Sequence, residues 1–383
     1  MQEIAERKVP KIVVAGHICL DITPVFRGNK ANRIEEAMVP GHLIQVGAAD
    51  VHVGGIVANT GLALKLMGAD VVLMGKVGKD LFGELILSQV GKYGDFSGMR
   101  IDDTVNTSYS VVIAPKGIDR IFLHHPGAND VFSIEDLDFS KIKEGQLFHF
   151  GYPPLMKRMY VNDGAELVKI FQKVKEMGIA TSLDMAAVDP DTDAGNANWK
   201  MILRGVLPFV DFFEPSAEEL AYMIDRKIYN EWVQRAEGRD LTDVIEITEI
   251  EYLAKKLLEW GAKIVLIKCG AKGIYFAANI KKELEKISLP VISEIVKWEK
   301  INFFECSYKP EQVLSGTGAG DTSIAAFLYA VTKGCTCKEC VQIAAAAGAS
   351  CVEGYDALSG LKSFEELRAR IRNGWEKTAS IME

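Results

Sequence analysis

The stretch Ser315-Gly316-Thr317-Gly318-Ala319-Gly320-Asp321 is the strongest local signal in the sequence. A run of apolar and small residues follows directly at 322–332 and predicts a helix. A glycine-rich loop that opens a helix points unpaired backbone N–H groups at one spot, where the helix dipole adds roughly half a positive charge. The sequence therefore predicts an anion site at the amides of Gly318, Ala319 and Gly320.

Asp321 needs an explanation in such a loop, because a carboxylate repels the phosphate that the loop would hold. As a residue at the helix N-terminus, it would simply cap or stabilise the first turn. As a functional residue, it would be a general base that takes a proton from a hydroxyl group while the same loop holds the phosphoryl group under attack. The loop alone leaves both interpretations open.

Strand and helix patterns alternate along the rest of the chain. Residues 11–16 (KIVVAG) are typical of a strand that is buried on both faces of a parallel sheet. Further apolar runs predict strands at 71–74, 146–150, 181–184, 209–213 and 263–268, with helical patterns at 58–67, 165–177, 250–260 and 338–349. The alternation predicts a doubly wound α/β fold with a mostly parallel central sheet flanked by helices.

Two segments, at about 22–53 and 104–126, do not fit the central sheet. The chain is polar after Asp21, and the stretches 42–53, 108–114 and 120–124 have the pattern of half-exposed strands. They predict a small β-sheet lid. Exposed lid edges are often covered by a partner, so we expect a homodimer joined lid to lid.

The lid is predicted to be an insertion in one domain that spans residues 11–372. Two further segments, 226–248 and 283–312, mix charged pairs with apolar residues and predict surface insertions or edge hairpins. Neither has the pattern of a separate domain.

The composition excludes several classes of protein. Lysine and arginine number 44 against 52 aspartates and glutamates, a net charge of −8, so no basic stripe is expected for nucleic acid. No apolar run approaches the roughly 20 residues that span a bilayer. The N-terminus lacks the apolar core of a secretory signal, and the seven cysteines are odd in number and mostly in apolar surroundings. We expect a cytoplasmic protein with reduced thiols.

Two motifs together make the sequence recognisable. Gly318-Ala319-Gly320-Asp321 resembles the C-terminal signature of the ribokinase-like (PfkB) carbohydrate kinase family. The stretch from Gly54-Gly55 through Asn59, continuing to Asp80 and Gly83, resembles the N-terminal signature of that family. Two signatures in the right order are far more specific than either alone. The resemblance extends over about residues 11–372.

The resemblance implies an ATP-dependent kinase that phosphorylates a hydroxyl group of a sugar or sugar-like substrate. Asp321 would be the catalytic base, and the amides of Gly318, Ala319 and Gly320 would form an anion hole for the transferred phosphoryl group. The substrate would be held by Asp21, which can accept two hydroxyl groups, and by Asn59, which can both donate and accept. Gly54 and Gly55 would let the sugar approach the backbone.

The resemblance also implies a nucleotide and metal environment. Pro215-Ser216-Ala217-Glu218-Glu219 is similar to the Asn-x-x-Glu motif of the family, with Ser in place of Asn, and Glu219 would organise the water shell of Mg²⁺. Lys268, Gly270 and Gly273 resemble the strand and turn that border the nucleotide. Lys268 either pairs with a phosphate or is a solvated residue at a strand end.

A monovalent cation is left undecided by the resemblance. The family commonly has Asp-Thr-Thr before the signature, whereas this chain has Ser315-Gly316-Thr317.

Other functions are less well supported. A nucleoside (adenosine-type) kinase would share the fold and the catalytic loop, and stays the nearest rival. A non-catalytic sugar-binding regulator is disfavoured by the intact Asp321. A nicotinamide-dependent oxidoreductase would need G-x-G-x-x-G after the first strand, and residues 16–21 contain a single glycine. No P-loop motif is present in the sequence.

Two groups of residues could suggest metal binding. His124 and His125 are adjacent on a predicted strand, so their side chains should point to opposite faces. Cys335, Cys337 and Cys340 lie between two predicted helices without a local fourth ligand, and we interpret them as helix-capping short side chains rather than a metal site.

Overall fold

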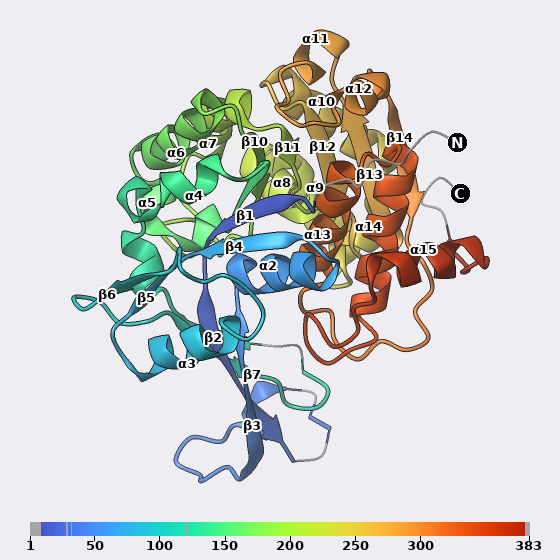
Figure 1. Cartoon of the computed structure of the whole chain (residues 1–383). Coiled ribbons are helices and arrows are strands. Elements are labelled where there is room, and N and C mark those ends of the chain that lie inside the picture. Colours follow the sequence, from blue (N-terminus) through green and yellow to red (C-terminus); the bar gives the residue numbers. More distant parts are fainter. Residues whose placement is uncertain (1–8, 28–29, 32, 119–120, 380–383) are drawn as a thin grey trace.

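The computed structural model describes residues 9–27, 30–31, 33–118 and 121–379. In this part of the chain an eight-stranded sheet runs through the body of the molecule in the order β14-β13-β12-β11-β10-β9-β1-β4 (Figure 1). Its strands are β1 (Lys11–Gly16), β4 (Asp70–Met74), β9 (Leu147–Gly151), β10 (Ala180–Asp184), β11 (Phe212–Phe213), β12 (Ile264–Lys268), β13 (Gly273–Ala278) and β14 (Asn302–Cys306). The strands from β4 to β12 pair in parallel, and β13 and β14 add antiparallel strands at one edge. The predicted doubly wound, mostly parallel sheet is confirmed.

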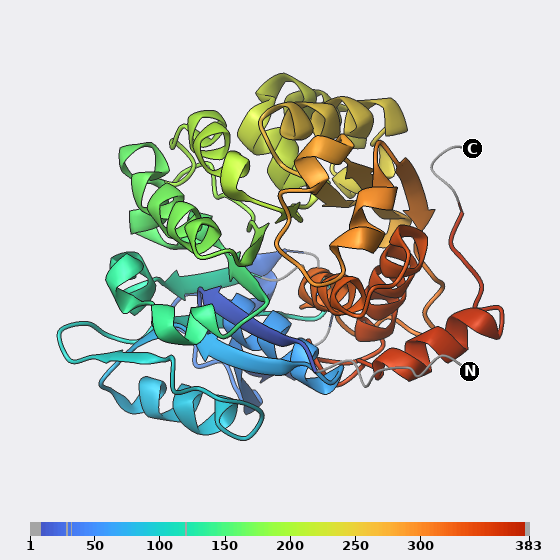
Figure 2. The ribbon, with the colours of Figure 1, turned by 45° about the horizontal axis from the view of Figure 1, so that its top comes forward.

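Helices cover both faces of the sheet (Figure 2). Because successive side chains of a strand point to opposite faces, β1 feeds two apolar cores. Ile12 and Val14 pack in the core of α2, α13 and α14, whereas Val13 and Ala15 pack in the core of α6, α7, α8 and α10. These helices are α2 (Ile56–Leu66), α6 (Ala165–Glu176), α7 (Trp199–Val206), α8 (Ala217–Ile224), α10 (Ile247–Glu259), α13 (Ala319–Thr332) and α14 (Cys337–Cys351). Burial on both faces explains why the strands read as continuous apolar runs.

The remaining elements are shorter or lie at the periphery. A two-stranded parallel sheet joins β5 (Lys76–Gly78) and β6 (Arg100–Asp102). The other helices are α1 (Ile34–Ala37), α3 (Leu81–Val90), α4 (Phe139–Lys143), α5 (Lys157–Tyr160), α9 (Arg226–Ala236), α11 (Lys281–Leu284), α12 (Ile292–Ile295) and α15 (Phe364–Arg372).

The lid is a four-stranded sheet in the order β3-β2-β7-β8 that projects from the body (Figure 1). Its strands are β2 (Cys19–Phe26), β3 (Val46–Gly54), β7 (Tyr109–Ile113) and β8 (Ile121–His125). Residue 120, the first of the predicted strand 120–124, lies outside the described residues. The small β-sheet lid is confirmed.

The pattern did not predict the strand after Asp21. β2 continues to Phe26 within the lid sheet. Pro24 hid this strand from the pattern, since proline cannot donate to a ladder. In the structure β7 pairs with β2 only at Leu20–Ile22, so Pro24 needs a partner only on the β3 side.

The two predicted surface segments are packed onto the domain. Residues 226–248 include α9, whose Trp232 is fully buried and donates to Glu249 Oε2 across 2.8 Å. Residues 283–312 include α12 and β14, which forms a hairpin with β13 at the edge of the central sheet.

The carboxyl ends of the parallel strands lie side by side along one end of the sheet. Gly16 lies beside Gly151, and Gly151 lies beside Asp184. Open α/β sheets bind their ligands at this edge. Among the described helices, none is both long and apolar enough to cross a membrane.

Candidate active site

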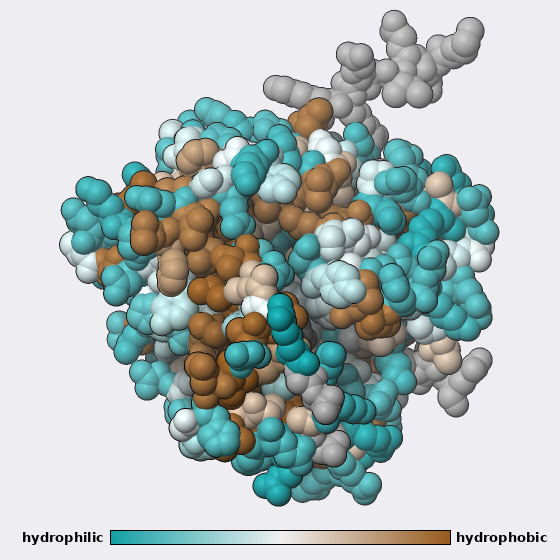
Figure 3. Space-filling view, turned by 90° about the horizontal axis from the view of Figure 1, so that it is seen from below, coloured by the Kyte–Doolittle hydropathy of each residue, from teal (hydrophilic) through white to brown (hydrophobic). Residues whose placement is uncertain are grey.

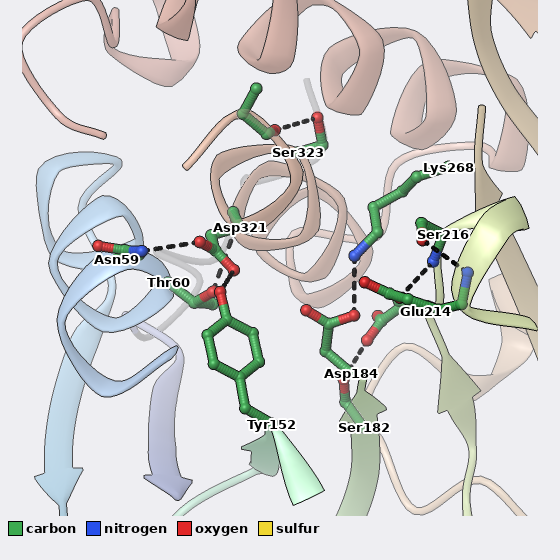
Figure 4. Close-up of polar contacts among 12 residues, drawn as sticks. Asn59, Thr60, Tyr152, Ser182, Asp184, Glu214, Ser216, Lys268, Asp321 and Ser323 are labelled. Atoms are coloured by element: carbon green, nitrogen blue, oxygen red, sulfur yellow. Dashed lines mark hydrogen bonds and ion pairs between the residues drawn. The ribbon is translucent and has the colours of Figure 1, made fainter. Parts of the chain in front are cut away.

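The carboxyl edge of the sheet brings together polar side chains from five elements (Figure 4). Tyr152 follows β9, Asp184 ends β10, Lys268 ends β12, Asp321 lies in the first turn of α13, and Asn59 lies in α2. The sheet fixes the first three by register, and α2 and α13 pack against each other to bring the other two together.

Asp321 is held at both carboxylate oxygens. Tyr152 donates its hydroxyl to Oδ1 across 2.5 Å, and Asn59 donates from Nδ2 to Oδ2 across 2.9 Å. Asp321 is 5% exposed, and burial raises the pKa of its carboxyl group, while the bond from Tyr152 and the charge of Lys268 oppose that rise. A carboxylate with fixed orientation and raised basicity is well suited to accept a proton.

The structure tests the interpretation of Asp321 as a helix cap. The N-cap of α13 is Gly318, and no side chain caps this helix. The Asp321 carboxylate instead points toward Asn59 and Tyr152 (Figure 4). Asp321 is thus a residue of the first turn and not the cap of α13, and its role as a base stays a prediction.

The glycine loop has no room for a side chain at Gly318. Gly318 adopts a left-handed conformation with φ of 76°, and a Cβ there would lie 2.2 Å from Ala357 Cβ. A Cβ on Gly320 would lie 3.5 Å from Lys268 Nζ, so the ammonium group stands beside the loop. The amide of Ala319 makes a long bond of 3.4 Å to Gly316 O. Anion binding by the loop stays a prediction.

Lys268 forms a buried ion pair with Asp184. Lys268 Nζ lies 2.7 Å from Asp184 Oδ1, and the two side chains are 14% and 2% exposed. Burial raises the pKa of Asp184, and the charge of Lys268 opposes that rise. Burial alone would lower the pKa of Lys268, but the neighbouring carboxylates, Asp184 first, raise it overall. Lys268 is thus a cation held by carboxylates rather than a solvated residue at a strand end.

Glu219 belongs to a capping box at the start of α8. Its Oε2 accepts from the Ser216 backbone N–H across 2.8 Å, and Ser216 Oγ accepts from the Glu219 N–H across 3.3 Å. Ser216, which stands in place of the Asn of the family motif, is the N-cap of α8, a position that both residue types favour. The backbone of Ser216 also forms an isolated β-bridge with that of Lys268. Glu219 therefore lies close enough to affect the pKa values of Asp184, Lys268 and Asp321.

The oxygen donors near Lys268 suit Mg²⁺ bound through water. Asp184, Glu219 and Asp321 supply carboxylates around a single ammonium group, and hard oxygen ligands are those Mg²⁺ takes. Within the described residues, no group of three or more His, Cys, Asp or Glu side chains could hold a metal ion directly. A metal here would keep its waters and phosphate ligands. The role of Glu219 as an outer contact stays a prediction.

The predicted substrate residues lie on the lid side of the site. Asp21 is in the middle of β2, and a Cβ on Gly54 would lie 2.0 Å from its Oδ2. Glycine at this position therefore makes room for the Asp21 carboxylate. Gly55 is the N-cap of α2. Asn59 donates one N–H of its amide group to Asp321, and its contact with the substrate stays a prediction.

Gly270 and Gly273 lie in the turn between β12 and β13, close to Lys268. Gly270 begins a 3₁₀ turn that lies near Thr242, and Gly273 packs against the backbone of β14 at Glu305. The turn is thus placed beside the site, and a role in nucleotide binding stays a prediction.

Sequence reasoning missed Tyr152 and Asp184. Asp184 carried a signal, because it ends a predicted strand at the ligand-binding edge. Tyr152 carried none, since its left-handed backbone (φ 67°) is not visible in the sequence.

A buried polar layer behind Asp184 was also missed. Ser182 Oγ lies 2.7 Å from His149 Nδ1 and donates to Glu214 Oε2 across 2.6 Å, and all three residues are fully buried. Burial lowers the pKa of His149 to about 3 and raises that of Glu214 well above its usual range. This uncharged network ties together the strands that carry Tyr152 and Asp184.

The two possible metal groups take other roles. The His124 ring lies 5.5 Å from His17, and the His125 ring lies 5.5 Å from Tyr109, so the adjacent histidines point to opposite faces as predicted. The capping interpretation of Cys335, Cys337 and Cys340 was wrong, because Thr336 caps α14 by accepting from Glu339 N.

Comparison with known proteins places this site in a family. The sequence pattern described as "pfkB family carbohydrate kinase" matches residues 10–363. The chain belongs to the pfkB family of carbohydrate kinases. It is 24% identical to a ribokinase from Arabidopsis thaliana over 362 residues, covering 92% of this chain and 78% of that protein.

Solved structures share the ribokinase-like fold. The structure of Arabidopsis thaliana ribokinase complexed with ribose and ATP matches with a TM-score of 0.69 and 21% identity, covering 94% of this chain and 98% of that one. A putative ribokinase II from E. coli in complex with ATP and Mg²⁺ matches with a TM-score of 0.67 and 19% identity, covering 95% and 100%. The protein is a carbohydrate kinase with this fold.

Proposed function

We propose that this pfkB-family enzyme transfers the γ-phosphoryl group of ATP to a hydroxyl group of a sugar or sugar-like substrate, with Asp321 as the general base. The observation that carries the proposal is the Asp321 carboxylate, fixed by Tyr152 and Asn59 directly behind the glycine loop. Relatives crystallised with ribose and ATP, or with ATP and Mg²⁺, support the choice of reactants.

The proposed reaction is a phosphoryl transfer in which Asp321, the loop amides and Lys268 each have a role. The substrate hydroxyl oxygen attacks the γ-phosphorus, the bond to the β–γ bridging oxygen breaks, and ADP leaves. Asp321 takes the hydroxyl proton. The amides of Gly318, Ala319 and Gly320 lie at the N-terminus of α13, where the helix dipole favours the charge on the transferred group. Lys268, beside Gly320, would add a full positive charge at the same point.

Mg²⁺ would neutralise phosphate charge when bound, and we assign its outer contact to Glu219. The supporting observation is the excess of carboxylates over ammonium groups around Lys268. The Ser216 N–H orients the Glu219 carboxylate, so one of its oxygens is fixed by the capping box.

We also propose that residues 11–372 act as one kinase domain that dimerises through its lid. Brown, apolar side chains gather on the face shown in Figure 3, which carries the lid. Ile121, Phe122 and Leu123 of the edge strand β8 are 38%, 56% and 57% exposed. An exposed apolar edge strand favours pairing with a second copy. We expect the enzyme in the cytoplasm, and its seven free cysteines support that expectation.

ATP consumption tests the proposed function. The purified enzyme with ATP and Mg²⁺ is screened against pentoses, hexoses, keto-deoxy acids, inositols and nucleosides. We expect ADP release that depends on one class of non-nucleoside acceptor. Preference for a nucleoside would favour the nucleoside kinase instead. No increase in ADP release with any acceptor of the panel would contradict the proposal.

A further inference from the structure

Three aromatic side chains form a continuous wall between Asp321 and the lid. The His17 ring lies 5.8 Å from the Tyr152 ring on one side and 5.5 Å from the His124 ring on the other. Tyr152 donates to Asp321, and His124 Nδ1 lies 3.0 Å from Ser110 Oγ. Ser110 is the β-ladder partner of Asp21. The wall therefore runs from Asp321 to Asp21, whose carboxylate is predicted to bind the substrate.

His17 is held rigidly at the centre of this wall. Its backbone N–H donates to Gly151 O and its carbonyl accepts from Val57 N–H, each across 3.2 Å. Its ring packs against the backbone of Gly55. A Cβ added to Gly55 would lie 2.7 Å from His17 Nδ1. The side chain is therefore fixed against the glycine pair at which the sugar is predicted to approach the backbone.

The ring nitrogens of His17 lack partners. The residue is 2% exposed, and neither Nδ1 nor Nε2 has a hydrogen-bond partner among the described residues. A neutral imidazole has one donor and one acceptor nitrogen, and leaving buried polar groups unpaired costs stability. A hydroxyl group both donates and accepts, so it suits either nitrogen. The unpartnered ring packs beside Tyr152, the donor to Asp321, and against Gly55, which makes it a candidate ligand for a substrate hydroxyl group.

The charges around the wall indicate which substrate it fits. Carboxylates stand at both ends, Asp21 and Asp321, and burial lowers the pKa of His17 to about 3 and also lowers that of His124. The rings between the carboxylates are thus uncharged at neutral pH. A substrate carboxylate would meet like charges at both ends, and the Lys268 ammonium group near Asp321 is already paired with Asp184. Hydroxyl groups find acceptors at both ends and both kinds of partner between them.

We propose that His17 is a specificity-determining residue that hydrogen-bonds a hydroxyl group of a neutral polyhydroxylated substrate, which reaches from Asp321 along the ring wall to Asp21. This inference rests on the proposed function. It goes further by naming a substrate ligand outside both signatures and by favouring neutral sugars and polyols over sugar acids.

The test compares His17→Leu with the wild type and with a matched control, His125→Leu, whose ring faces the other side of β8. D-Ribose, D-fructose and myo-inositol are the neutral probes, and D-gluconate and 2-dehydro-3-deoxy-D-gluconate are the acidic ones. We expect a neutral probe to have the highest kcat/KM. His17→Leu should raise its KM about tenfold, as loss of one hydrogen bond predicts, with kcat within about threefold. His125→Leu should match the wild type.

A second measurement separates a substrate ligand from a structural histidine. Because the ring nitrogens have no partners, the ligand-free His17→Leu protein should melt at the wild-type temperature or above it. The stabilisation that the best neutral probe gives the wild type should be smaller in the variant. This measurement does not require turnover, so it still tests His17 if no probe is phosphorylated and the proposed function fails.

Three results would overturn the inference. A fall of several degrees in the ligand-free melting temperature of His17→Leu would show that the ring is structural. An unchanged KM and an unchanged ligand-induced shift would remove it from the substrate site. A higher kcat/KM for either acid than for every neutral probe would refute the substrate class.

Discussion

Replacing Tyr152 with Phe removes one hydroxyl group from the wall of the active site and leaves the ring in place. That hydroxyl donates to Asp321 Oδ1 across 2.5 Å. Burial and the Asp321 charge raise the pKa of Tyr152 well above its usual range, so the phenol stays protonated and donates at every pH of interest. In Tyr152→Phe, Asp321 keeps only the bond from Asn59.

Two effects follow from this loss. The bond from Tyr152 stabilises the charged carboxylate, so its removal raises the pKa of Asp321 further. A base must be deprotonated to work, so the acidic limb of the pH profile of kcat/KM moves to higher pH. The second effect is on orientation: a hydrogen bond worth about 1.4 kcal/mol holds the carboxylate, and its loss should lower kcat about tenfold on the plateau.

The assay follows ADP release by a coupled enzyme reaction from about pH 5 to 9, at saturating ATP and with the best acceptor from the screen. Tyr160→Phe is the matched control, since its ring packs on Trp199 away from Asp321. We expect the control profile to match the wild type. An acidic limb that moves to lower pH would contradict the sign of the argument. A profile and plateau that both stay unchanged would show that Tyr152 does not act on the base.

Three further predictions follow from the geometry. Glu219→Gln keeps the capping acceptor for Ser216 N–H but loses the charge, so the Mg²⁺ concentration for half-maximal rate should rise several-fold, and an unchanged Mg²⁺ dependence would remove Glu219 from the metal site. Gly318→Ala should destabilise the fold by about 1–3 kcal/mol in chemical denaturation, because φ is 76° and the new Cβ meets Ala357 at 2.2 Å; Gly316→Ala, with nothing within 4 Å of its Cβ, is the control and should stay near wild type. Light scattering at micromolar concentration should give the mass of a dimer, and a monomer would argue against the exposed β8 edge as an interface.

The central sheet could be predicted because burial on both faces leaves a strong signal. Residues such as Val13 and Val14 serve cores on opposite faces, so each strand is apolar throughout. β2 was harder, since its proline breaks the expected pattern and only the limited pairing with β7 makes it acceptable. Asp321 was found because a carboxylate in a glycine loop conflicts with the local chemistry.

The contacts within the site could not be predicted in the same way. The bond from Asn59 to Asp321 depends on the packing of α2 against α13, which the sequence does not show. Tyr152 lies 169 positions from the base, and only the strand register and a left-handed backbone bring its hydroxyl there. Lys268 was predicted as a neighbour of phosphate, whereas its pairing with Asp184 depends on two strands separated by β11.

The most direct test of the account is the single-turnover rate and steady-state kcat of Asp321→Asn on the best acceptor. Asn has nearly the same size as Asp and does not disturb the cap of α13, because that cap is Gly318. The Asn side chain cannot take a proton from the acceptor hydroxyl group, and general-base catalysis contributes about 10²–10⁴-fold to the rate. We predict that kcat falls at least ~10²-fold while ATP affinity changes little, since the loop amides remain. A variant that keeps most of its kcat would contradict the assignment of Asp321 as the base.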